Sequence, residues 1–134
     1  MNEQAKIMAA DLPALADTSA NFIGGAWENA ESGTFPVVNP ATGETIALLP
    51  ASSRATAHRA IEAANAAQPA WAKVPLWDRA ALCVKLADAI DANLEDLARV
   101  LSMEQGKPLA QSMGEVGKAA DGFRMNAELV KYMT

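Results

Sequence analysis

Side chains that could act as nucleophiles or general bases are few in this sequence of 134 residues. It contains one cysteine, Cys83, and one histidine, His58. Cys83 lies between Leu82 and Val84 in a predicted helix, a setting typical of an inert thiol that is at least half-buried. His58 precedes Arg59 on the charged side of another predicted helix, where a solvated imidazole is the simplest interpretation. No catalytic pair is predicted from these two residues.

Sites for a phosphate group or a metal ion are not evident either. Two Gly-Lys pairs, in residues 106–108 and 117–119, lack the upstream glycine and the downstream hydroxyl residue of a P-loop, and no GxGxxG occurs. Four carboxylates lie close together in the sequence: Asp88, Asp91, Glu95 and Asp96. Their helical spacing spreads them around a surface and a helix start, so we expect a solvated face rather than a metal site.

The composition is that of a soluble globular protein. Hydrophobic residues make up 51% and charged residues 20% of the chain. The net charge of −5 and the scattered basic residues argue against nucleic acid and acidic membrane surfaces as partners. A single cysteine excludes an internal disulfide, and residues 1–20 lack the unbroken apolar stretch of a secretory signal. We expect a cytoplasmic protein with a flexible N-terminal arm over residues 1–20.

Residues 21–50 carry the pattern of short antiparallel strands. Apolar residues flank the pair Gly24-Gly25, which is typical of a hairpin turn. Residues 34–38 and 45–49 flank an Asn-Pro-Ala-Thr-Gly-Glu turn. Pro36 lacks an amide hydrogen, so its strand should lie at an edge or be bulged. We predict one small antiparallel sheet of three or four strands.

After Pro50 the apolar residues recur about every three and a half positions, which predicts helices. Ser52 or Ser53 caps the first helix and Pro69 limits it. Its predicted buried face consists of Ala57, Ala60, Ile61, Ala64 and Ala67, opposite Arg59, Glu62 and Asn65. The second helix begins after Pro75. Its predicted buried face consists of Leu82, Leu86, Ala89 and Ile90, whereas Arg79, Lys85 and Asp88 are expected to face water.

Two further helices follow. Asn93 is the predicted cap of the third helix, and Gly106 suits its left-handed C-terminal end. Pro108 fits the first turn of the fourth helix. The fourth helix has an apolar stripe with steps of four and three residues, formed by Leu109, Met113, Val116, Ala120, Phe123, Ala127 and Val130. Gly114, Gly117 and Gly122 weaken that helix, so we expect a neighbouring backbone to approach closely there.

Several strings, in this order, resemble the aldehyde dehydrogenase superfamily. Residues 22–27 are similar to its opening hairpin, and residues 38–44 to its Asn-Pro-Ala-Thr-Gly-Glu turn. Residues 104–109 resemble its Glu-x-Gly-Lys-Pro-Leu junction, and residues 114–116 its Gly-Glu-Val string. Between them, a spacing typical of the family is formed by Trp71, Arg79, Leu82, Leu86, Ala87, Asp88 and Ile90. The resemblance extends over residues 21–134.

The resemblance implies an α/β fold, with residues 21–134 as the N-terminal portion of a coenzyme-binding domain. This portion would be a small antiparallel strand meander followed by about four helices, an incomplete Rossmann-like domain. It also implies an NAD- or NADP-dependent enzyme, a homo-oligomer, that oxidises a small-molecule aldehyde to a carboxylic acid through a cysteine thiohemiacetal and thioester. In the family the catalytic residues and the cofactor-binding residues follow the position of Thr134. We therefore expect neither kind of residue in this chain, which resembles a truncated enzyme.

The resemblance implies one partial metal site. Val38 and Glu104 match positions whose backbone carbonyls bind a monovalent cation in many family members, and a third ligand would come from sequence that this chain lacks. Two functional hypotheses stay open: a truncated dehydrogenase that is inactive alone, and a non-catalytic binding or oligomerisation module that pairs with full-length subunits. In either case an uncovered apolar stripe on the fourth helix should leave the isolated chain molten or oligomeric.

Overall fold

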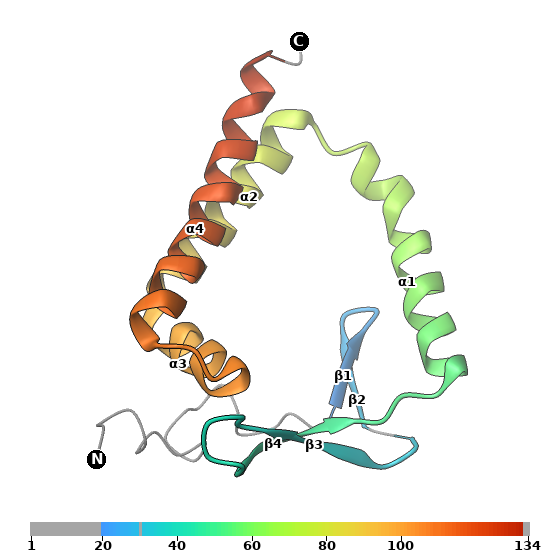
Figure 1. Cartoon of the computed structure of the whole chain (residues 1–134). Coiled ribbons are helices and arrows are strands. Elements are labelled where there is room, and N and C mark those ends of the chain that lie inside the picture. Colours follow the sequence, from blue (N-terminus) through green and yellow to red (C-terminus); the bar gives the residue numbers. More distant parts are fainter. Residues whose placement is uncertain (1–19, 30, 133–134) are drawn as a thin grey trace. The chain divides into compact units, whose positions relative to one another are not determined.

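The computed structural model describes residues 20–29 and 31–132, in the order of strands and helices that the sequence predicts. The elements are β1 (Ala20–Ile23), β2 (Ala26–Asn29), β3 (Thr34–Val38), β4 (Thr45–Pro50), α1 (Arg54–Ala72), α2 (Leu76–Ala92), α3 (Leu94–Gln105), α4 (Leu109–Glu128) and the 3-10 helix η4 (Leu129–Tyr132) (Figure 1). They form two compact units, one ending at Lys73 and one starting at Val74. Apart from Ala20, which is in β1, the predicted N-terminal arm lies outside the described residues.

The four strands pair only with their sequence neighbours. β1 pairs antiparallel with β2 around Gly24 and Gly25, whose φ angles are +61° and +87°. β3 pairs antiparallel with β4, with a bulge between Val37 and Val38. The antiparallel strands are confirmed, but the single sheet that we predicted is wrong, because the described strands form two separate two-stranded sheets. Each strand is thus an edge, which accommodates the missing amide hydrogen of Pro36.

Helix α1 starts as predicted and ends later than predicted. The Ser53 hydroxyl accepts a hydrogen bond from the Thr56 amide at 3.1 Å, so Ser53 is the cap. Pro69 lies inside the helix, which continues to Ala72, because a proline near the end removes only one amide donor. The predicted buried face is wrong: Ile61 is 65% exposed, whereas Arg59, expected in solvent, is half-buried.

Helices α2 and α4 lie side by side and bury mainly small residues (Figure 1). Ala80, Ala87, Ala120 and Ala127 are 8% exposed or less. The buried alanines of α4 and the buried Val130 of η4 confirm part of the predicted stripe, but Met113 and Phe123 are exposed. On α2, the predicted burial of Leu82, Leu86 and Ala89 is wrong. Alanine lets two helix axes approach closely, so the alanine side of α2, rather than its leucine side, packs on α4.

The ends of α2 and α3 are set by polar and glycine residues. Asn93 occupies the predicted N-cap position of α3, but its side chain donates to the Ala89 carbonyl at 2.8 Å, so its hydrogen bond caps the end of α2. Gly106 is the predicted left-handed cap of α3, with φ +70°. A Cβ atom placed on Gly114 or Gly122 would meet no described atom within 4 Å, so the predicted close backbone approach is not found there.

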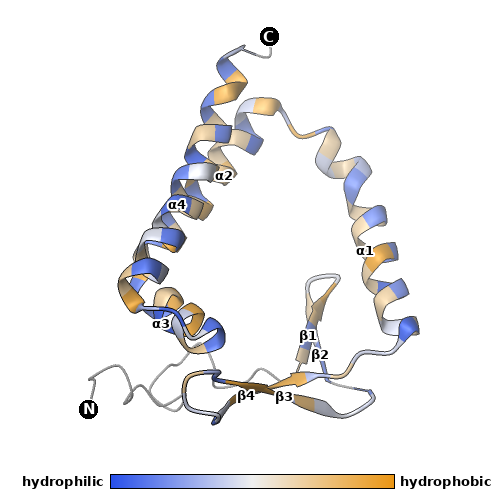
Figure 2. Cartoon of the chain, viewed as in Figure 1, coloured by the Kyte–Doolittle hydropathy of each residue, from blue (hydrophilic) through white to orange (hydrophobic). Residues whose placement is uncertain are grey.

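Hydrophobic positions recur along β3, β4 and all four helices (Figure 2). They are interrupted by polar residues throughout. Among the described helices, none combines the length and the apolar character that a membrane crossing requires.

Candidate functional site

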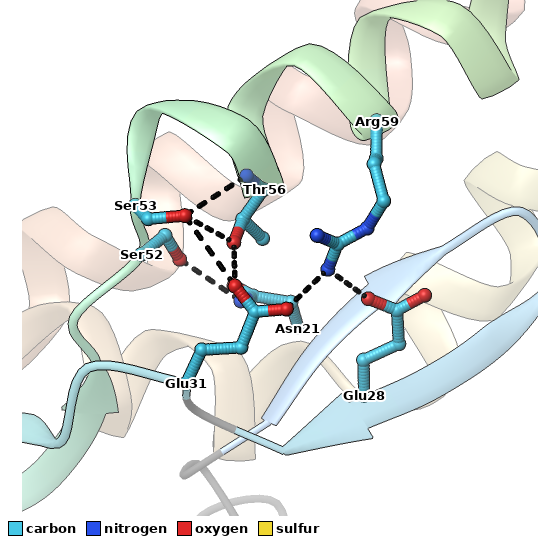
Figure 3. A network of polar contacts seen from close by, with 7 residues as sticks. All are labelled: Asn21, Glu28, Glu31, Ser52, Ser53, Thr56 and Arg59. Carbon is cyan, nitrogen blue, oxygen red and sulfur yellow. Dashed lines mark hydrogen bonds and ion pairs between the residues drawn. The ribbon is translucent and has the colours of Figure 1, made fainter.

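The largest polar network described lies where the β1–β2 hairpin meets the start of α1 (Figure 3). Its hydrogen bonds and ion pairs join Asn21, Glu28, Glu31, Ser52, Ser53, Thr56 and Arg59. These residues come from β1, β2, the segment after β2, the link between β4 and α1, and the first two turns of α1. The network therefore joins segments about thirty residues apart in sequence.

Glu31 is the centre of this network. Its Oε2 accepts a hydrogen bond from the Thr56 hydroxyl at 2.7 Å and a longer one from the Ser53 hydroxyl at 3.4 Å. Its Oε1 accepts from Arg59 Nη2 at 2.9 Å. The hydrogen bond from Thr56, followed by those from Arg59 and its positive charge, lowers the pKa of Glu31. A carboxylate with a lowered pKa is a weaker base, so this arrangement does not favour proton abstraction.

Arg59 joins the hairpin to the helix. Its Nη2 also contacts Glu28 Oε2 at 2.9 Å, so one guanidinium group bridges two carboxylates. The hydrogen bonds that Arg59 donates to Glu28 and then to Glu31 raise the pKa of Arg59. Asn21 adds a hydrogen bond to the Ser52 hydroxyl at 2.9 Å. No cysteine, histidine or lysine takes part, and we interpret the network as the attachment of α1 to the hairpin.

A second polar cluster joins α2 to α4. Arg124 Nη2 lies 2.7 Å from Asp88 Oδ1 and 2.7 Å from Asp91 Oδ2. The hydrogen bonds that Arg124 donates to Asp88 and then to Asp91 raise the pKa of Arg124. Asp88 and Asp91, two of the four carboxylates in the acidic stretch of the sequence, therefore both pair with Arg124. Within the described ranges, no group of three or more His, Cys, Asp or Glu residues could hold a metal ion.

The single histidine and the single cysteine lie where the sequence predicts. His58 is exposed on α1. Cys83 is a free, half-buried thiol on α2, packed against the cluster of Ala80, Ala127 and Val130. Among the described residues, neither side chain forms a hydrogen bond or an ion pair that would join a nucleophile to a base.

The two positions of the predicted cation site belong to different compact units. Val38 follows the β3 bulge and is 45% exposed, and Glu104 is exposed in the last turn of α3. The cation site therefore stays a prediction.

Neither Gly-Lys segment of the described residues forms a dinucleotide-binding loop. Lys107 follows the end of α3, and its ammonium group pairs with Glu115 while its carbonyl accepts a hydrogen bond from the Ser102 hydroxyl. The other Gly-Lys pair lies within the continuous helix α4. Neither segment forms a glycine-rich loop at the start of a helix after a strand, which is where pyrophosphate binds.

Sequence reasoning missed two features of these units. It did not find the Glu31–Arg59 network, whose partners are too far apart in sequence for a local motif to reveal them. It also placed Arg79 in water, whereas Arg79 is half-buried and its Nε lacks a hydrogen-bond partner among the described residues. The spacing of Arg79 four residues before Cys83 and eight before Ala87 could have indicated this position.

Comparison with known proteins places these units in context. Residues 27–134 match the model of the aldehyde dehydrogenase family. The glutarate-semialdehyde dehydrogenase of Pseudomonas putida is 42% identical over 111 residues, which are 82% of this chain and 23% of that protein. A 3,6-anhydro-alpha-L-galactose dehydrogenase of Streptomyces coelicolor is 42% identical over 110 residues, covering 81% of this chain and 22% of that protein.

Solved structures agree with these sequence matches. The crystal structure of succinate-semialdehyde dehydrogenase from Burkholderia pseudomallei shares 44% identity with a TM-score of 0.80, over 87% of this chain and 24% of that one. The chain thus spans about a quarter of the length of the relatives that it matches.

Proposed function

Because the chain belongs to the aldehyde dehydrogenase family, we propose that it supplies the N-terminal portion of the coenzyme-binding domain of an NAD- or NADP-dependent aldehyde dehydrogenase. The enzyme would oxidise a small-molecule aldehyde to a carboxylic acid in the cytoplasm, as a homo-oligomer. The match of residues 27–134 to the family model supports this proposal most strongly.

We expect the 134 residues alone to be inactive. The reaction needs a cysteine thiolate that adds to the aldehyde carbonyl and a base that activates water. Cys83 is the only cysteine, and it packs among alanines on the α4 side of α2, without a described base beside it. The two Gly-Lys segments also form no dinucleotide-binding loop. The nucleophile, the base and the cofactor site would therefore come from sequence outside these 134 residues.

The test is a direct assay. The purified chain, mixed with a panel of aldehydes and with NAD or NADP, should not generate reduced cofactor. The Pseudomonas putida glutarate-semialdehyde dehydrogenase, assayed in parallel with its own substrate, provides the positive control. Steady turnover by the 134-residue chain would show that it is not inactive alone, and loss of this turnover in a Cys83→Ala variant would identify Cys83 as the nucleophile. The genomic sequence after the codon for Thr134 tests whether this chain is the N-terminal portion of a longer dehydrogenase. We expect it to encode a cysteine-centred motif preceded by a glutamate.

A second candidate function is a non-catalytic module that pairs with full-length subunits. The observation that favours it is the uncovered apolar surface of the described residues, including Ile61 at 65%, Trp77 at 55% and Met125 at 64% exposure. Size-exclusion chromatography of the chain, alone and mixed with a full-length family member, distinguishes the two candidates. Stable co-elution with the full-length subunit supports the module, and separate elution contradicts it.

A further inference from the structure

One half-buried basic side chain lacks a counter-charge. The described residues contain five half-buried Lys or Arg side chains: Arg59, Arg79, Arg99, Lys107 and Arg124. Four of the five form ion pairs with Asp or Glu. Arg79 forms none within the described ranges, and its Nε is shielded from solvent without a hydrogen-bond acceptor. A shielded guanidinium nitrogen without an acceptor destabilises a folded protein, so Arg79 is suited to bind an anion from outside the described residues.

Two uncovered leucines lie beside Arg79. Arg79, Leu82 and Leu86 occupy positions i, i+3 and i+7 of α2 and therefore share one face of the helix. Leu82 is 46% exposed and Leu86 is 45% exposed. Helix α4 packs on the neighbouring face, through the buried Ala80 and Ala87, and leaves this face open. We call the three residues the Arg79 strip.

We propose that the Arg79 strip is the docking surface for a helix of another polypeptide segment that carries an aspartate or glutamate within its apolar face. The carboxylate binds the Arg79 guanidinium, and the flanking apolar side chains cover Leu82 and Leu86. A row of side chains spaced by three and four residues fits the groove of a second helix. Binding supplies the acceptor that Arg79 Nε lacks among the described residues and removes leucine surface from water.

A second copy of the strip does not meet these requirements. If two copies of α2 pair antiparallel about the centre of the strip, Arg79 of one copy lies opposite Leu86 of the other. If they pair in parallel, the two Arg79 side chains approach each other and repel. Asp88 and Asp91 of the same helix are already paired with Arg124, and an antiparallel contact that brought Asp78 of a second copy to Arg79 would be centred on the start of α2 and would leave Leu86 uncovered. The partner is therefore a different segment, with its own carboxylate.

A matched pair of helical peptides tests the inference on the whole chain. Both carry one leucine stripe with a single polar position inside it, glutamate in one peptide and glutamine in the other. Fluorescence anisotropy with labelled peptides should show about tenfold tighter binding of the glutamate peptide, typical of a charge-assisted bond. Arg79→Met should abolish this difference. Arg99→Met, which removes another half-buried arginine whose partner is Glu95, should leave the difference unchanged.

Further variants keep the inference testable if Arg79→Met disturbs folding. Arg79→Lys retains the charge and should retain part of the preference for glutamate. Leu86→Gln should weaken both peptides without changing their ratio. Equal affinity of the unaltered chain for the two peptides would overturn the proposal, and so would a preference that survives Arg79→Met. Self-association of the chain that Leu86→Gln abolishes, without peptide binding, would overturn it in favour of a second copy. None of these measurements depends on aldehyde oxidation, so the docking proposal and the proposed dehydrogenase function can be refuted independently of each other.

Discussion

Replacing Ser112 by alanine should stabilise the protein. Ser112 lies in α4, is 0% exposed, and its hydroxyl has no hydrogen-bond partner among the described residues. A buried hydroxyl without a partner costs about 1 to 3 kcal/mol. Alanine removes this cost, leaves only a small void, and adds roughly 0.5 kcal/mol of helix propensity. We therefore expect Ser112→Ala to raise the free energy of unfolding by about 1 to 2 kcal/mol.

Ser102→Ala is the matched control, because Ser102 also lies in a helix but its hydroxyl donates to the Lys107 carbonyl. Removing that bond costs about 1 kcal/mol, which the propensity gain of roughly 0.5 kcal/mol only partly offsets. Urea unfolding followed by far-ultraviolet circular dichroism should therefore move the two midpoints in opposite directions, at equal slopes. If Ser112→Ala lowers the midpoint as Ser102→Ala does, the Ser112 hydroxyl has a partner and the reasoning fails.

Three further predictions concern other parts of the chain. Gly106→Ala should lower the free energy of unfolding by about 1 to 2 kcal/mol, because φ at Gly106 is +70°, a left-handed conformation that alanine disfavours. Gly117→Ala is the control, since its new Cβ would lie 3.9 Å from a leucine methyl. It should not destabilise the protein in the same urea titration. The lowered pKa of Glu31 implies that its carboxylate stabilises the folded chain above pH 4.5, the ordinary value, and that this stabilisation is lost as the pH falls through the lower pKa of the folded state. Acid unfolding of Glu31→Gln should lack this loss of stability. An acid-unfolding curve identical to that of the unaltered chain would contradict the Arg59 network. Cys83 should react with a maleimide roughly tenfold or more slowly in the folded chain than in urea, since it packs between α2 and α4; equal rates would show that this packing does not persist in solution.

The element order was predictable because glycine, proline and capping residues act locally. Gly24-Gly25 turns a hairpin, Ser53 caps α1 and Gly106 ends α3 in the left-handed conformation that the residue type favours. The pairing of strands was less predictable, because each of the two hairpins satisfies its own turn and nothing local decides whether they join into one sheet.

The buried faces of the helices were predicted less well, for a reason specific to alanine. Periodicity finds the most hydrophobic side of a helix, and on α2 that side carries Leu82 and Leu86. The side that packs on α4 carries Ala80 and Ala87, whose small size permits close approach. A hydrophobicity ranking favours leucine, whereas helix contact here depends on shape. The polar network around Arg59 could not be predicted for a different reason. Its partners, Glu28 and Glu31, are brought to Arg59 by the path of the chain and not by a local sequence motif.

The alanine contact between α2 and α4 has a consequence for alignment along the helix axes. Large side chains that interlock oppose a sliding movement, and the four alanines of this contact, Ala80, Ala87, Ala120 and Ala127, oppose a slide of one turn, about 5.4 Å, less than larger residues would. Arg124 marks one axial position, because in the observed alignment it pairs with Asp88 and Asp91 together. The charges would thus select the axial position of the pair while burial holds the helices together. High salt, which screens exposed charges, should accordingly broaden the distribution of alignments before it separates the helices.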